Sequence, residues 1–255
     1  MADVALDIGS RLTKVYFAGD RAGKRIFETP KGVQILKERL NPGTSMEELD
    51  SFLLVLSCAS RFMGTQKNVK LLVSADENPI FSQYVLRWLT STTFQGHCSI
   101  VDQHSWMLNL YGSLENGCVV DIGNQATRVV PVMFGTPVVE AITIGSGIQQ
   151  LFLQAAEEAV DLQETLLNST YFKLHIPSPA VADWIMMLIE ESVLLCNPHT
   201  QRSFVCKVFL ITGGGVASDW LVKALRSNII KNWPSSRVLF VSDSAPMLWM
   251  AGHGF

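Results

Sequence analysis

Two short segments of the sequence have the residue types needed to hold a phosphate group and a hydrated cation. ALDIGSRLTK, residues 5–14, and VVDIGNQATR, residues 119–128, each run from an apolar stretch through Asp-Ile-Gly into a second apolar stretch. This pattern predicts a β-hairpin with a tight polar turn. The glycine allows positive φ or a close approach of the backbone, turn N–H groups can bind a phosphate, and a neighbouring aspartate can hold a hydrated cation.

The two segments correspond position by position. Asp7 matches Asp121, Gly9 matches Gly123, Thr13 matches Thr127, and Lys14 matches Arg128. A single Asp-x-Gly turn is most simply explained as a plain turn. Two copies, together with a third glycine cluster at Gly213-Gly214-Gly215, predict two similar half-domains that face one cleft.

Length and composition limit the class of protein. The chain has 255 residues, of which 48% are hydrophobic and 17% charged, and its net charge is −3. This length fits one large domain or two small ones. The slightly negative net charge gives no indication of a basic surface that would bind nucleic acid. No run approaches the roughly 18 apolar residues of a membrane span, and the N-terminus lacks the pattern of a signal peptide. The five scattered cysteines are expected to be reduced thiols of an intracellular protein.

The hydrophobic periodicity predicts alternating strands and helices in each half. In the first half, Pro30–Pro42 reads as a short polar connection, and Ser45 and Glu48 form a capping box for the next helix. The expected strands are Val4–Leu6, Thr13–Phe17, Arg25–Phe27, Val69–Ser74, Cys98–Val101, Pro137–Ile142, Lys207–Thr212 and Val238–Val241. The other expected helices are Asn78–Thr92, His104–Leu114, Ile148–Ala159, Ala180–Leu195 and Asp219–Ser227.

DIGSRLTKVYFAGDRAGKRIF, residues 7–27, resembles the N-terminal signature of actins and actin-related proteins. The resemblance covers nearly the whole chain and implies the actin/Hsp70/hexokinase superfamily. It implies an α/β, actin-like fold, with two duplicated half-domains, 1–117 and 118–255, around a nucleotide cleft. In that family the first hairpin binds the nucleotide phosphates, and its lysine, here Lys14, reaches the β and γ oxygens.

The resemblance also implies which residues would bind a nucleotide, with ATP or ADP and Mg²⁺ as the expected cofactors if binding is retained. Asp7 and Asp121 would hold the metal indirectly, through water, although both could instead cap their own turns through Asx hydrogen bonds. The complete implied set is Asp7, Gly9, Ser10, Lys14, Asp121, Gly123, Asn124, Thr127, Gly213, Gly214 and Gly215.

Catalysis is not expected from the same comparison. The family's water-orienting glutamine corresponds to Ser105, and an assisting histidine corresponds to Arg128. Arg11 replaces a small residue in the first phosphate turn. No catalytic residue is therefore predicted. The five histidines, His104 among them, show no metal-ligand spacing and are expected to be surface or core residues.

Missing segments favour a scaffold over a polymerising ATPase. From the resemblance we expect that the family's second subdomain has no counterpart after the first hairpin, that the fourth is reduced to an irregular stretch over Val160–Pro179, and that the tail after Ala245–Gly252 is missing. MEELDSFLLVLSCASRF and SVLLCNPHTQRSFVCKVFLITGGG resemble the divergent actin-related proteins at the pointed end of dynactin.

That resemblance implies a non-catalytic cytoplasmic subunit of the cytoskeleton. It would cap the actin-related filament of dynactin and support dynein-driven, microtubule-based transport, with filament subunits and other pointed-end subunits as partners. No nucleic acid and no membrane insertion are expected. The alternatives are a filament-forming ATPase, a sugar or acetate kinase of the superfamily, and a subunit of a nuclear chromatin-remodelling complex.

Overall fold

The computed structural model describes residues 4–17, 24–40, 45–60, 68–91, 97–110, 114–148, 150–151, 179–197 and 201–241. Most of the predicted helix Ile148–Ala159, nearly all of the stretch Val160–Pro179 and the segment Ala245–Gly252 lie outside these residues. The described residues form two compact units, one ending at Gln103 and the other beginning at His104. Each unit is an α/β structure built on one mixed β-sheet.

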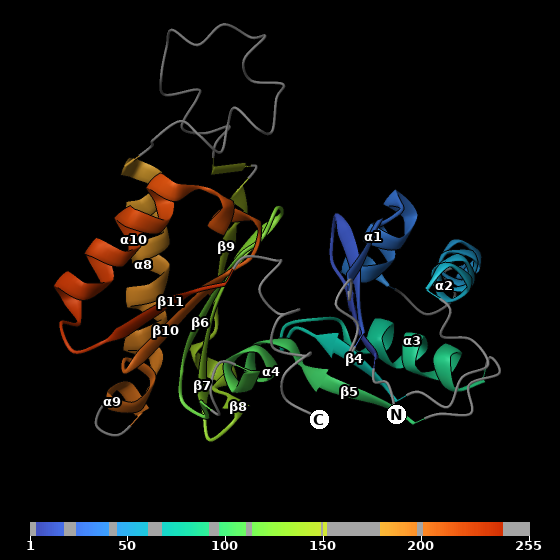
Figure 1. Ribbon diagram of the computed structural model, residues 1–255, viewed down its shortest axis with the longest axis horizontal. Coiled ribbons are helices and arrows are strands. Elements are labelled where there is room, and N and C mark those ends of the chain that lie inside the picture. Colours follow the sequence, from blue (N-terminus) through green and yellow to red (C-terminus); the bar gives the residue numbers. More distant parts are fainter. Residues whose placement is uncertain are drawn as a thin grey trace, which may run out of the picture. The chain divides into compact units, whose positions relative to one another are not determined.

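The first unit contains a five-stranded sheet with the order β3-β2-β1-β4-β5. The first three strands are antiparallel neighbours, whereas β4 and β5 run parallel to β1. Three helices, α1, α2 and α3, accompany the sheet (Figure 1). The elements are β1 (Val4–Ile8), β2 (Leu12–Phe17), β3 (Lys24–Glu28), α1 (Lys31–Arg39), α2 (Glu47–Ala59), β4 (Val69–Val73), α3 (Pro79–Ser91) and β5 (Cys98–Asp102).

All three helices of the first unit pack on one face of its sheet. Val4, Leu6 and Ile8 of β1 share a hydrophobic core with side chains of α1, α2 and α3. Because side chains alternate along a strand, Ala5 and Asp7 lie on the opposite face. The Asp7 side chain therefore points away from the helical core, although Lys37 of α1 reaches the backbone carbonyl of Ile8 at the end of β1.

Helix α1 lies where the sequence predicted a polar connection. Val33, Leu36 and Leu40 recur at helical spacing and are buried in the core of the first unit. The predicted capping box is also absent, since α2 begins after Met46 and Glu48 accepts a hydrogen bond from the Gly32 N–H of α1 at 3.2 Å. Packing between two short helices replaced the local cap.

The second unit contains a six-stranded sheet with the order β11-β10-β6-β7-β8, in which β9 also pairs with β7. The predicted strand Pro137–Ile142 is instead the short β8 followed by a 3₁₀ turn, η1. The elements are α4 (Gln103–Leu110), β6 (Gly117–Ile122), β7 (Ala126–Met133), β8 (Thr136–Pro137), η1 (Val139–Ala141), β9 (Thr143–Ser146), α8 (Pro179–Leu195), α9 (Gln201–Val205), β10 (Val208–Thr212), η2 (Gly214–Ala217), α10 (Asp219–Asn232) and β11 (Arg237–Phe240).

Helix α4 belongs almost entirely to the second compact unit, which begins at His104, whereas the sequence predicted a second half-domain from residue 118. A Cβ atom at Gly117 of β6 would lie 3.1 Å from a methyl group of Leu108, so α4 packs closely on this strand. His104, at the start of the same helix, lies beside Asp121 of β6. Long-range packing thus joined α4 to the sheet that follows it in the sequence.

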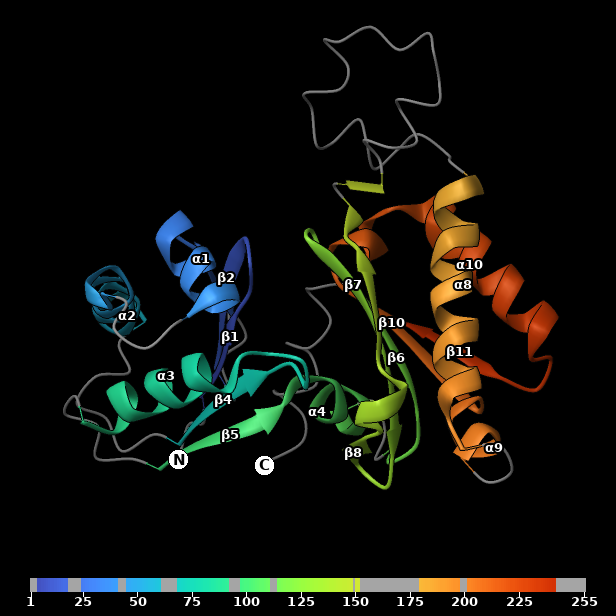
Figure 2. The same ribbon diagram turned by 180° about the vertical axis from the view of Figure 1, so that it is seen from behind.

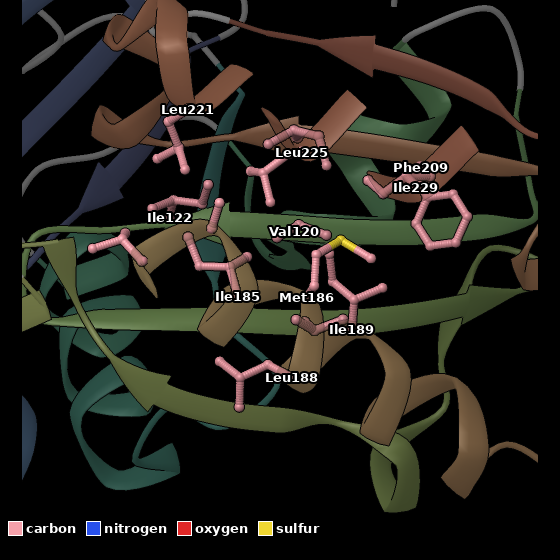
Figure 3. Close-up of a cluster of buried hydrophobic side chains, with 14 of the residues drawn as sticks. Val120, Ile122, Ile185, Met186, Leu188, Ile189, Phe209, Leu221, Leu225 and Ile229 are labelled. Atoms are coloured by element: carbon pink, nitrogen blue, oxygen red, sulfur yellow. The ribbon is translucent and has the colours of Figure 1, made fainter. Parts of the chain in front are cut away.

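The other face of the second sheet carries α8 and α10, which lie side by side in both ribbon views (Figures 1 and 2). Figure 3 shows Val120 and Ile122 of β6 among side chains from both helices. Ile185 of α8 and Leu221 of α10 are fully buried in this cluster. Strand β6 therefore has one continuous apolar face, which packs against the helices, and a second face that carries Asp121.

The two units repeat one arrangement of elements. Three antiparallel strands are followed by helices, a parallel strand, one helix and a last parallel strand. The strand order β3-β2-β1-β4-β5 thus corresponds to β9-β7-β6-β10-β11. The Asp-Ile-Gly repeat of the sequence occupies the same hairpin in both units. Within the described part of the chain, every helix is too short or too polar to cross a membrane.

A hydrogen bond between α2 and α3 offers a test of the first core. The Tyr84 hydroxyl donates to Asp50 Oδ1 at 2.7 Å, so Tyr84→Phe should lower the free energy of unfolding in urea by about 1–2 kcal/mol. Burial, and then the hydrogen bond and charge of Asp50, raise the pKa of Tyr84 from 10.0 to about 12. The folded state therefore holds this proton more tightly than the unfolded state does.

The effect of Tyr84→Phe should accordingly be constant below pH 10.0 and should shrink as the pH rises toward about 12. Asp50→Asn is the matched variant, because it removes the charge but keeps an acceptor oxygen. A spectrophotometric titration should then give Tyr84 a lower pKa than in the wild type. An unchanged pKa in Asp50→Asn would contradict this account of the contact.

Candidate phosphate-binding turns

The two hairpin turns close in the same way. The Gly9 N–H donates to Leu12 O at 3.2 Å, and the Gly123 N–H donates to Ala126 O at 3.0 Å. A Cβ atom would lie 2.6 Å from that oxygen at Gly9 and 2.7 Å from it at Gly123. Glycine is therefore required to close each turn, and its own N–H is used within the turn.

Each turn is also fastened by the chain that follows the third strand. The Thr29 N–H donates to Arg11 O at 2.9 Å, and in the second unit the Gly147 N–H donates to Gln125 O at 2.9 Å. Gly9 O accepts a hydrogen bond from the Thr29 hydroxyl, as Gly123 O does from the Ile148 N–H, both at 2.9 Å. The sequence repeat thus folds into a repeated hydrogen-bonded frame.

Thr127 is part of this frame. Its side chain is fully buried, and its hydroxyl donates to Ser146 O of β9 at 2.9 Å. In the first unit Thr13 is equally buried, and its hydroxyl lies 2.9 Å from that of Thr29. Within this structure both threonines fasten the hairpin to its third strand.

The first turn carries a set of four charged side chains. Asp7 is buried, and its carboxylate lies 3.7 Å from Lys14 Nζ, its register partner on β2. Lys37 of α1 donates to Ile8 O and lies 2.9 Å from Glu77 Oε2. Burial raises the pKa of Glu77, Lys37 opposes that effect, and the nearby Asp7 adds to it.

The residues that the sequence predicted for the first turn therefore lie close to one another in the structure. Gly9 and the half-buried Ser10 follow directly on the buried end of β1, and Lys14 returns to Asp7 from the opposing strand. Arg11 is exposed at the tip of the turn. In this structure Lys14 pairs with Asp7 across the two strands of the hairpin.

The second turn has a different chemical surrounding. Asp121 is half-buried and pairs in register with Arg128. The Nε2 atom of the fully buried His104 lies 4.0 Å from Asp121 Oδ2. The resemblance placed Ser105 at the water-orienting position and gave His104 no role. A lone histidine in an apolar helix gives no signal of its own, and only the packing of α4 on the sheet brings it to Asp121.

The glycine cluster after β10 completes the second turn. Gly213 has φ = 89°, and a Cβ atom there would lie 2.5 Å from Ile122 O and 2.6 Å from Asp121 Oδ1. A Cβ atom on Gly215 would lie 2.5 Å from the Ile122 side chain, whereas one on Gly214 would meet nothing within 4 Å. Gly213 and Gly215 thus let this turn approach β6, and Gly123 and Asn124 begin the neighbouring hairpin turn.

The acidic side chains that the structure describes at the two turns do not form a cluster of metal ligands. Among the described residues, no three His, Cys, Asp or Glu side chains are grouped as metal ligands would be. Asp121 offers a carboxylate at a glycine-lined turn, which fits a cation held through water. Asp7 is already paired with Lys14, and the ammonium of Lys37 pairs with Glu77. Compared with known proteins, the chain matches no protein-family model and no curated protein sequence.

Two adjacent glycines provide a matched test of the second turn. Gly213→Ala should lower the free energy of unfolding by roughly 2–4 kcal/mol, because its φ is positive and its Cβ would clash with backbone and carboxylate oxygens. Gly214→Ala should change it by no more than about 0.5 kcal/mol. Chemical denaturation of both variants measures the difference. Equal effects would show that the close approach of Gly213 to β6 is not made in solution.

Proposed function

We propose that this chain is a non-catalytic, actin-related scaffold subunit that caps the pointed end of the actin-related filament of dynactin and supports dynein-driven transport. The observation that carries the proposal is the repeated frame. The same glycine-closed hairpin lies on the same strand order in both units. Such a duplication is what an actin-like fold requires, and it supports the resemblance of residues 7–27 to that family.

The connection from β3 to β4 supports a filament-ending role. Its described residues form α1 and α2, which pack into the first core and do not build a separate lobe. A subunit without the second subdomain would offer one competent end to a filament and end its growth there. Exposed apolar side chains fit coverage by neighbouring subunits, as on α2, where Val55 is 61% exposed, and on α8, where Met187 is 65% exposed.

The resemblance implies that the turn at Gly9 and, within the second unit, the turn at Gly123 with the glycine cluster at Gly213 would each contact nucleotide phosphates if binding is retained. The contact between His104 and Asp121 is the observation that favours the alternative, a filament-forming ATPase, because a histidine near an acidic residue could act as a general base. The complete burial of His104 argues against that role, because a general base must reach the attacking water.

Phosphate release separates the two functions. We expect no significant ATP turnover, because Ser105 and Arg128 stand at the positions of the water-orienting and assisting residues. Release at the rate of a conventional actin would contradict the scaffold proposal. In that case His104→Asn should abolish turnover, and His97→Asn, which changes an exposed histidine, should not.

Assembly provides the second test. The purified chain should not sediment as filaments under nucleotide and salt, and it should bind the pointed end of the dynactin filament in single copy. Its partners, identified by affinity purification from the source cells, should be filament subunits and pointed-end subunits. Filaments of the chain alone would rule the cap out. Recovery only with a chromatin-remodelling complex would move the proposal to a nuclear scaffold.

A further inference from the structure

One side chain from α1 lies at the end of β1, where the resemblance implies a metal-linked aspartate. Lys37 is in the last turn of α1, and its ammonium donates to Ile8 O, the carbonyl between Asp7 and Gly9. The same ammonium lies 2.9 Å from Glu77 Oε2. The Lys37 side chain is 21% exposed and that of Glu77 only 6%, so this ion pair is largely removed from water.

The surroundings of Lys37 are rich in oxygen. A backbone carbonyl from Ile8 and a carboxylate from Glu77 contact it directly, and Asp7 is close enough to act electrostatically on Glu77. Carbonyl and carboxylate oxygens are the ligands that Mg²⁺ and Ca²⁺ prefer in proteins. Here an ammonium, which has three donors and one positive charge, fills that environment.

The charges in this cluster already balance. Asp7 and Glu77 carry two negative charges, and Lys14 and Lys37 carry two positive charges. Two buried carboxylates near one another are unfavourable without such partners. A divalent cation added to this cluster would leave an excess of positive charge in a poorly hydrated place.

We propose that Lys37 is a built-in cation that replaces a divalent metal ion at the first turn, so that this unit needs no Mg²⁺ beside Asp7. The inference concerns the first unit alone and rests on the contacts of Lys37, independently of the proposed scaffold function. It assigns α1 a role beyond covering the core, because this helix delivers the charge that pairs with Glu77 and contacts the Ile8 carbonyl next to Asp7.

The test is to remove the ammonium and supply a metal ion. Lys37→Met keeps the length and apolar stem of the side chain but removes the ammonium from Glu77 and from the Ile8 carbonyl. Its thermal midpoint should fall, and millimolar Mg²⁺ or Ca²⁺ should raise it again by about 2–4 °C. The wild type and Lys31→Met, which changes an exposed lysine of the same helix, should show no such shift.

The double variant Lys37→Met/Glu77→Gln identifies the source of the shift. It removes one positive and one negative charge, so it should be more stable than Lys37→Met and should lose the response to Mg²⁺. A response that persists in the double variant, or none in Lys37→Met, would overturn the proposal.

A direct measurement covers the case in which Lys37→Met does not fold. Mn²⁺ binding to the wild type, followed by water-proton relaxation, should be the same in the wild type and in Asp7→Asn. A Mn²⁺ site that is present in the wild type and lost in Asp7→Asn would show that a metal ion binds at the first turn despite Lys37. That result would also overturn the proposal.

Discussion

A Cβ atom does not fit at the first residue of either hairpin turn, and much of the structure depends on this constraint. Gly9 and Gly123 each bring their N–H to a carbonyl three residues later, at a separation that any other residue would block. The closed turn fixes the register of the two strands that it joins. That register places Asp7 opposite Lys14 and Asp121 opposite Arg128.

The sheets then separate apolar packing from charge. Alternate residues of β1 and β6 face the helices, and the remaining residues carry the aspartates on the other face. The aspartates are consequently held by strands that are buried along most of their length. The position of each carboxylate is therefore set by the strand that carries it.

The same backbone arrangement is surrounded by different side chains in the two units. In the first unit the loop after β4 contributes Glu77, and α1 contributes Lys37, so carboxylates meet ammonium groups. In the second unit the loop after β10 contributes Gly213 and Gly215, and α4 contributes His104. The divergence lies in the connections between strands, where length and composition can change without disturbing the sheet. The first turn therefore carries a charge cluster, and the second turn has a glycine-lined backbone.

The sequence alone determined the features that depend on neighbouring residues. The repeated Asp-Ile-Gly turns, most strands and α3, α8 and α10 follow from local glycine chemistry and hydrophobic periodicity. Tertiary structure decided the pairing of Lys37 with Glu77 and the contact of His104 with Asp121, because each joins elements that no periodicity relates. It also decided the assignment of α4 to the second unit and the formation of α1. A short helix with few apolar residues is stable only when a core accepts them, and that core is assembled from distant strands.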